Sequence, residues 1–230
     1  IFAGAQQQAP CEASGSDPSG TTQGQWADGQ PTGTGGTDHG HADPSSGATG
    51  QNVYGYNLNG DYVNNMPQYH LTTAAIDCSG ISRTSLKFQR WLNVEQPAYD
   101  HAYVSVSNNG TSWTDVYSNG SAIADNSCSP VSFDISSVPD GESTVYVRWT
   151  MGTTDGSWLY SGWNIDDVAI WGVEPECPGD FNGDGDVNTI DVLAFLNAWS
   201  AGDASGDFNG DGTINTQDVL AFLNAWNTPC

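Results

Sequence analysis

The sequence predicts a mainly β fold, an antiparallel jelly-roll β-sandwich followed by a small α-helical unit with two repeated acidic loops. From residue 53 to residue 172, short runs of β-branched and aromatic residues alternate with polar residues, which is typical of antiparallel sandwiches. Beyond residue 180 the apolar period becomes helical, and a loop followed by a helix occurs twice. The segment VEPECPG (173–179), with two prolines, separates the two patterns.

We expect four segments along the chain. Residues 1–25, rich in Gln, Gly and Ser, form an extended N-terminal arm, 26–172 the β-sandwich, 173–179 a linker and 180–230 the helical unit. The arm has no apolar period of its own, so packing against something else is needed to order it. One hypothesis is that it docks on a neighbouring subunit as an added strand.

Composition excludes several classes of protein. The chain has 4 Lys and Arg against 27 Asp and Glu, a formal net charge of −23, so phosphate backbones and anionic membranes repel it. No apolar run is long enough for a membrane-spanning helix. Nine Trp, nine Tyr and seven Phe supply a core, which argues against disorder. The start at Ile1 rather than Met suggests a processed, secreted product.

The expected strands are short and separated by turn sequences. The turns are NNG (108–110), SNG (118–120) and PDG (139–141). Within 102–107, Tyr103 and Ser105 fall on one face and Val104 and Val106 on the other. The runs themselves are NVYGYNL (52–58), QYHLTTAAI (68–76), TSLKFQRWLNV (84–94), HAYVSVSN (101–108), WTDVYS (113–118), VSFDI (131–135), STVYVRWTM (143–151) and WNIDDVAIWGV (163–173).

The helical unit is a duplication. The sequence DVLAFLNAW occurs at 191–199 and again at 218–226, 27 residues later. In the first copy Val192, Phe195, Leu196 and Trp199 recur at i, i+3, i+4 and i+7, which predicts one apolar helix face in each copy.

Each helix follows an acidic loop that matches the calcium-loop pattern D-x-N-x-D-G. The loops are DFNGDGDVNTID (180–191) and DFNGDGTINTQD (207–218). A calcium ion takes six to eight oxygens, and such loops supply them from positions 1, 3, 5, 7, 9 and 12. The expected ligands are Asp180, Asn182, Asp184, Asp186 (by its carbonyl), Asn188 and Asp191 in the first loop, and Asp207, Asn209, Asp211, Thr213 (by its carbonyl), Asn215 and Asp218 in the second. At the sixth positions, Gly185 and Gly212 are expected to have positive φ.

Asp at position 12, no helix before either loop and the tandem repeat together make residues 180–226 resemble a type I dockerin module. The resemblance implies two bound calcium ions and a cohesin-type partner. It places the partner contacts at Thr189, Ile190, Thr216 and Gln217. Because dockerin termini lie close together, it also implies a Cys177–Cys230 disulfide, with a loop-closure gain on the order of 4 kcal/mol.

Residues 26–172 resemble MAM-like and carbohydrate-binding-module-like jelly rolls of bacterial extracellular proteins. The run GWNIDDVAI (162–170) carries most of this resemblance. One interpretation of its acid pair is a structural calcium site, formed by Asp166 and Asp167 with Asp38, Asp43 or Asp61. The alternative is that strand alternation turns one Asp outward and the other against a backbone N–H.

Other residues in the sandwich allow two interpretations each. The aromatic residues form either a sugar-stacking platform or part of the core; they are Trp91, Trp149, Trp158, Tyr160 and Trp163. Asn109 and Asn119 lie in sequons and are candidate glycosylation sites. In an oxidising compartment, we favour a Cys78–Cys128 disulfide with Cys11 left over.

No local motif favours catalysis: Glu95, Glu142 and Glu174 lie in no recognised catalytic pattern. We therefore expect a non-catalytic, secreted, calcium-binding bacterial protein. The first hypothesis is a structural subunit of an extracellular or cell-surface fibre or matrix, a homopolymer held by calcium and inter-subunit contacts. The alternative is a carbohydrate- or protein-binding module anchored to a cohesin scaffold.

Overall fold

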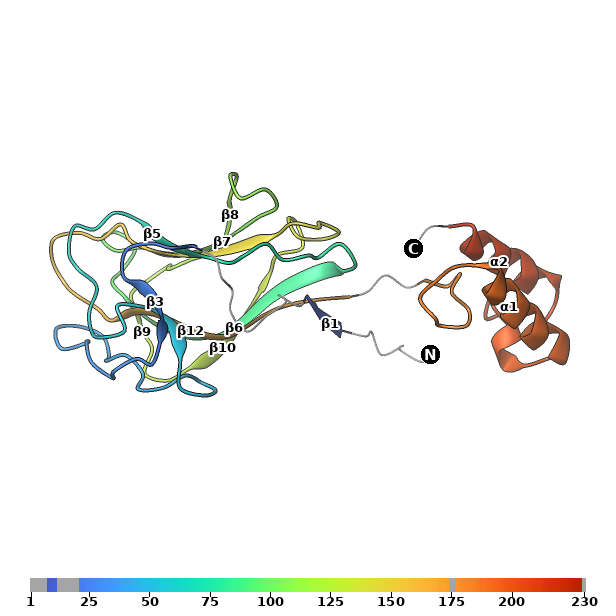
Figure 1. Cartoon of the computed structure of the whole chain (residues 1–230), viewed down its shortest axis with the longest axis horizontal. Coiled ribbons are helices and arrows are strands. Elements are labelled where there is room, and N and C mark those ends of the chain that lie inside the picture. The colour runs from blue at the N-terminus through green and yellow to red at the C-terminus, as the bar shows by residue number, and fades with distance from the viewer. Residues whose placement is uncertain (1–7, 12–20, 174–176, 229–230) are drawn as a thin grey trace. The chain divides into compact units, whose positions relative to one another are not determined.

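The structure, a computed structural model, divides the chain into two units, Ile1–Glu174 and Pro175–Cys230. It describes residues 8–11, 21–173 and 177–228. The first unit is made of two antiparallel sheets and the second of two helices with their loops (Figure 1). The predicted fold class, a mainly β sandwich with a small helical unit, is confirmed.

The larger sheet has seven strands and is built around two long ones. Its order is β10 (Ser129–Asp134), β6 (Ser82–Val94), β12 (Gly162–Val173), β4 (Val53–Tyr56) and β3 (Trp26–Gly29), with β1 (Gln8–Cys11) on β12 and β9 (Ile123–Ala124) on β6. The smaller sheet has the order β2 (Thr21–Thr22), β5 (Tyr69–Thr72), β11 (Tyr146–Met151), β7 (Ala102–Ser107) and β8 (Thr114–Ser118). Figure 1 shows the two sheets as two layers, with β5 and β7 in one and β6 and β12 in the other.

The core fills the space between the sheets. From β6, Leu86 and Leu92 are fully buried, and Val104 of β7 and Trp149 of β11 meet them from the other sheet. The period-2 alternation of the strands places these residues inside and their neighbours on the outer faces. Burial of this apolar surface is the main stabilising contribution to the unit.

The described parts of the N-terminal arm pair with this chain's own sandwich. Strand β1 runs antiparallel to β12, with Gln8 opposite Val173, and β2 pairs with β5. The hypothesis of an arm that adds a strand to a neighbouring subunit is therefore corrected for Gln8–Cys11. The backbone groups of Gln8–Cys11 pair with β12 of the same chain, so this segment already occupies that part of the sheet edge.

The acid pair of β12 lies at a β-bulge. The register with β6 shifts between Asp166 and Ala169, and Asp167 has a φ of 52°. Asp166 accepts the N–H of Thr49, and Asp167 accepts the hydroxyl of Thr49. The two carboxylates therefore hold the loop that contains Thr49 against the bulge.

The predicted Cys78–Cys128 disulfide is wrong, because the two cysteines are not bridged to each other. The carbonyl of Cys78 accepts the N–H of Ile81, where β6 begins. Cys128 precedes Ser129, which pairs with Arg90 far along β6. Eight strand residues separate those places, roughly 26 Å, whereas disulfide Cα atoms lie about 4.4–6.8 Å apart. The predicted Cys177–Cys230 bridge involves Cys230, which lies outside the described residues, and stays a prediction.

The second unit consists of α1 (Thr189–Ala201), a 3-10 turn η1 (Ala204–Gly206) and α2 (Thr216–Trp226). Its core is a cluster of four phenylalanines in which Phe195 stacks on Phe222 with ring centroids 4.3 Å apart. Phe181 and Phe208 meet both stacked rings edge-on. Neither described helix has the length and apolar character of a membrane-spanning segment.

Candidate functional site: the acidic loops and the sheet groove

Each acidic loop is organised around its first aspartate. In the first loop, the Asp180 carboxylate accepts the N–H groups of Gly183, Asp184 and Gly185 at 2.8, 3.1 and 2.8 Å. Gly185 and its counterpart Gly212 have φ of 90° and 83°, which confirms the predicted left-handed turn. The backbone therefore wraps around the carboxylate at position 1 of the loop.

The second loop repeats these contacts around Asp207. The Asp207 carboxylate accepts the N–H groups of Asp211 and Gly212 at 3.1 and 2.8 Å. Two loops 27 residues apart thus reach the same backbone geometry from the same residues.

The aspartate at position 12 joins each loop to its helix. Asp191 accepts the N–H of Asn182 on Oδ1 and that of Asn188 on Oδ2, and Asn188 in turn caps α1. Asp218 and Asn215 do the same for α2. These backbone N–H groups, that of Asn188 first, lower the pKa of Asp191, so it stays ionised.

The donor set of the loops fits calcium. Each loop offers carboxylate, amide and backbone carbonyl oxygens, the hard ligands that calcium takes. Each carboxylate oxygen of Asp191 accepts one N–H and keeps lone-pair capacity for a cation. The assignment of the twelve loop positions as calcium ligands is a proposal.

A tryptophan at the end of each helix connects it to the other loop. Trp199 of α1 donates its ring N–H to the carbonyl of Asn215, and Trp226 of α2 donates to the carbonyl of Asn188, both at 2.8 Å. The two loops and two helices therefore form one cross-linked unit.

The four predicted partner residues all lie on the surface. Thr189, Thr216 and Gln217 are exposed, and the Ile190 side chain is 56% exposed. They are accompanied by apolar side chains that equivalent positions of both helices leave in solvent: Leu193, Leu196, Leu220 and Leu223. Their exposure makes this part of the unit a candidate interaction surface.

The predicted sugar-stacking trio is not brought together. Trp163 is fully buried and donates to the carbonyl of Thr150, and Tyr160 is buried as well. Trp149 is also in the core, and Trp91 donates to the carbonyl of Ala42. Trp158 is 48% exposed and stacked on His39, whereas Tyr160 and Trp163 are buried, so the prediction for Tyr160 and Trp163 is wrong.

The predicted glycosylation site at Asn119 is also wrong. Its side chain is 2% exposed, donates to the carbonyls of Glu95 and Asp100, and accepts the N–H of Ala102. A buried amide with these partners is not accessible to a glycan. Asn109 is exposed in its turn and remains a candidate.

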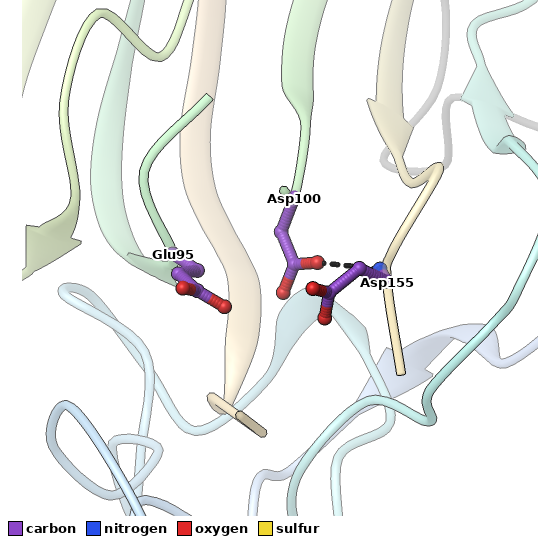
Figure 2. Close-up of side chains that lie close together, drawn as sticks. All are labelled: Glu95, Asp100 and Asp155. Atoms are coloured by element: carbon purple, nitrogen blue, oxygen red, sulfur yellow. Dashed lines mark hydrogen bonds between the residues drawn. The ribbon is translucent and has the colours of Figure 1, made fainter. Parts of the chain in front are cut away.

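The predicted calcium group of the sandwich is not assembled either. Asp43 is buried beside Asn164, while Asp166 and Asp167 contact Thr49. Among the residues that the structure describes, the one group of three acids close enough to hold a metal is Glu95, Asp100 and Asp155 (Figure 2). The sequence gives no sign of this group, because Asp155 follows β11 and is far along the chain from the loop that holds Glu95 and Asp100.

A groove on the outer face of the five-stranded sheet was also missed. It is a hollow of about 260 Å³ lined by Gln68, His70, Tyr103, Ser105, Trp113, Asp115, Arg148 and Thr150. Register explains the grouping: Thr150 of β11 lies between His70 of β5 and Tyr103 of β7, and Arg148 lies opposite Ser105. These side chains form rows across the sheet because they occupy the alternate positions to the core residues.

The groove combines rings with hydrogen-bonding groups. The Arg148 guanidinium lies 3.6 Å from the ring centroid of Trp113, and Ser105 donates to Asp115 at 2.6 Å. Burial and the nearby Arg148 lower the pKa of His70, whose ring lies 2.8 Å from the Thr150 hydroxyl. His70 is therefore neutral at pH 7 and offers one donor and one acceptor.

The chain is thus a β-sandwich followed by a helical unit with two acidic loops. Residues 178–227 match the family model described as the dockerin type I domain, a class that generally binds calcium. A comparison with curated proteins found no match.

Solved structures resemble the sandwich at low identity. One is the K3 cleaved adhesin domain of Lys-gingipain from Porphyromonas gingivalis W83, with 15% identity, coverage of 72% of this chain and 99% of that chain, and a TM-score of 0.39. Another is SGBP-B from a xyloglucan utilization locus of Bacteroides uniformis, with 14% identity, coverage of 68% and 46%, and a TM-score of 0.44. A third is TmCBM61 in complex with β-1,4-galactotriose, with 9% identity, coverage of 55% and 74%, and a TM-score of 0.35.

Proposed function

We propose that the chain is a non-catalytic extracellular binding module that docks through its C-terminal unit, in a calcium-dependent way, onto a cohesin-type partner. The observation that carries this proposal is the set of exposed apolar side chains at equivalent positions of the two helices. The equivalent residues Leu193 and Leu220 are 62 and 64% exposed. An isolated soluble unit gains nothing from leaving them in solvent, whereas a partner would bury them.

Calcium supports the docking surface through the loops. Asn188 and Asn215 cap the two helices, and both lie within the proposed calcium loops. Ligands held by the ion therefore fix the first turn of each helix, where the partner residues begin. The proposed ligands are the twelve loop positions named from the sequence.

The experiment is binding to an immobilised type I cohesin module, with calcium and with chelator. Leu193→Asp combined with Leu220→Asp is expected to abolish binding, because a charge replaces an apolar contact on both helices. Val63→Asp is the matched control, since Val63 is an exposed apolar residue of the sandwich. Binding that survives the double substitution or the chelator would contradict the proposal.

For the sandwich we propose carbohydrate binding in the groove of the five-stranded sheet. Tyr103 and Trp113 supply ring surface for the apolar faces of sugars, and Asp115, Arg148 and His70 supply partners for hydroxyl groups. This choice replaces the self-assembling fibre hypothesis, whose main support was an arm docked on a neighbouring subunit.

A glycan array with the whole protein identifies the sugar, and calorimetry of the best hit measures its affinity. Trp113→Ala is expected to weaken binding about tenfold, the contribution of one aromatic contact. Trp158→Ala is the control, because Trp158 is exposed outside the groove. An array without hits, or a loss with Trp158→Ala alone, would refute groove binding and leave cohesin docking intact.

A further inference from the structure

We propose that Glu95, Asp100 and Asp155 form a calcium site at one end of the β-sandwich, in addition to the C-terminal loops. Figure 2 shows the three carboxylates pointing toward one another. The site is independent of cohesin docking and of carbohydrate binding in the groove.

The three acids come from strand ends in both sheets. Glu95 directly follows β6 of the seven-stranded sheet, and Asp100 lies just before β7 of the five-stranded sheet. Asp155 lies in the loop that follows β11, and the last residue of β11, Met151, pairs with Ala102 of β7. An ion held by all three therefore joins the ends of the two sheets.

The spacing of the carboxylates suits calcium. One oxygen from each residue lies within 4.8 Å of the other two. Calcium binds oxygens at 2.3–2.6 Å, so ligands on opposite sides of the ion are up to about 5 Å apart. The three oxygens therefore fit around one ion with room for further ligands.

The strongest evidence for a bound ion is the buried carboxylate of Glu95. Its side chain is 3% exposed, and Oε2 is buried with no hydrogen-bond partner in the part of the chain that the structure describes. Figure 2 shows the carboxylate aimed at the other two acids. A buried carboxylate oxygen without a donor is costly unless a cation or a proton is bound to it.

The other two carboxylates are held in place by hydrogen-bond donors. Asp100 accepts the Tyr62 hydroxyl on Oδ2 and the backbone N–H of Asp155 on Oδ1. Asp155 accepts the backbone N–H and the hydroxyl of Ser157. These donors fix the orientation of the two carboxylates within the group.

No Lys or Arg side chain compensates the group. Arg90 pairs with Asp125, and Lys87 and Arg148 lie over the rings of Trp171 and Trp113. Arg83 is at the opposite end of β6 from Glu95, roughly 40 Å along the strand. His39 and His101 interact electrostatically with Glu95 and Asp100 respectively, but each is the smallest of the causes that set the pKa of its acid.

The surrounding electrostatics point the same way. Burial, and then the charges of Asp100 and Asp155, raise the pKa of Glu95. Burial also raises the pKa of Asp100. A divalent cation replaces this repulsion by attraction, which makes the empty group unfavourable and the filled group stable.

The loop between Glu95 and Asp100 is held in place beforehand. The buried Asn119 side chain donates to the backbone carbonyls of both residues at 2.9 Å. Asn119 also accepts the N–H of Ala102, the first residue of β7. Two of the three ligands therefore stand on one preformed loop, which lowers the ordering cost of binding.

The test is to count calcium ions on the whole protein by native mass spectrometry. The wild type is expected to carry one ion more than Glu95→Gln and Asp155→Asn, both of which keep side-chain shape and remove a charge. Asp155 is only half-buried, so its variant keeps the test valid if Glu95→Gln fails to fold. Asp43→Asn is the control, because Asp43 is a buried acid of the same unit outside the group.

An unchanged count in both Glu95→Gln and Asp155→Asn would overturn the proposal, as would loss of the ion in Asp43→Asn. An ion of another mass would overturn the assignment to calcium. If the wild type carried the ion at this site but none in the loops 180–191 and 207–218, the calcium role of the C-terminal unit would be contradicted and this site would stand. Failure of this proposal and failure of the proposed docking are therefore distinguishable.

A second measurement separates a ligand from a merely structural residue. Hydrogen exchange of peptides from β7 and β11 is expected to show opposite effects of Glu95→Gln. In chelator the variant protects these strands better, because repulsion is removed. In calcium it protects them less than the wild type, because the ion is lost. The same sign in both conditions would contradict ion binding.

Discussion

Replacing Asp43 with asparagine is expected to stabilise the β-sandwich at neutral and alkaline pH but not at acid pH. The Asp43 side chain is 4% exposed. Its Oδ1 accepts the amide N–H of Asn164 at 2.6 Å, while Oδ2 is buried with no described hydrogen-bond partner. Burial, reinforced by the charge of Asp61, raises the pKa of Asp43 from 3.8 to about 7.

The direction and size of the change in unfolding free energy follow from the pKa shift of Asp43. A carboxyl group whose pKa is higher in the folded state contributes full stability below its unfolded pKa and loses it as pH rises through the folded value. The window is therefore pH 3.8 to about 7. A shift of about three pKa units corresponds to about 4 kcal/mol of unfolding free energy, as an upper bound. Asparagine does not titrate, so its advantage over aspartate grows across this window.

The assay is urea unfolding of the whole protein in saturating calcium at pH 4, 5.5 and 7.5, followed by tryptophan fluorescence. All but two of the nine tryptophans, Trp199 and Trp226, precede the C-terminal unit. Asp134→Asn is the control, because Asp134 is exposed and its pKa is lowered by Ser136. A variant advantage that stays constant from pH 4 to 7.5 would refute the reasoning.

Further predictions concern hydrogen bonds between elements and the glycosylation sequons. Trp199→Phe is expected to weaken calcium binding by the loop 207–218, and Trp226→Phe by the loop 180–191. Each effect is about fivefold, because one hydrogen bond worth about 1 kcal/mol is lost. Calorimetric titration measures both sites, and weaker binding in the loop that precedes each tryptophan's own helix would contradict the cross-link. Asn119→Ala is expected to cost about 2–4 kcal/mol in urea unfolding, since three hydrogen bonds to buried groups are lost. In a glycosylating host, peptide mapping is expected to find modification at Asn109 and none at Asn119, and a glycan on Asn119 would contradict its burial.

Local patterns made the C-terminal unit predictable. The calcium-loop spacing, the turn glycines and the helix period each involve residues a few positions apart, so the sequence contains the geometry. The turn glycines Gly185 and Gly212 have the expected positive φ. The strands and their alternation were predictable for the same reason, since period-2 patterns are local.

The predictions that were wrong concern which residues meet across the fold, and that is not a local property of the sequence. Alternation says that Trp163 is on one face of its strand but does not say that this face is the core. The Cys78–Cys128 pairing failed because strand register, set by distant residues, puts the two cysteines far apart. Asn119 carries a sequon that only the tertiary structure reveals as buried.

The sheet groove and the group of Glu95, Asp100 and Asp155 could not be found from one sequence. Asp100 and Asp155 meet because β7 and β11 are neighbours, and Glu95 joins them only when the two sheets stack. Acids are numerous in this chain, so composition favours no particular set of three.

Calcium-dependent folding of the C-terminal unit is the central claim, and amide hydrogen exchange of the whole protein with and without chelator tests it most directly. On calcium removal, we expect residues 189–201 and 216–226 to lose protection first, because ions that hold Asp191 and Asp218 also hold the two helix caps. Core strands β6 and β12 are expected to keep most of their protection. Unchanged protection of both helices in excess chelator would contradict the account.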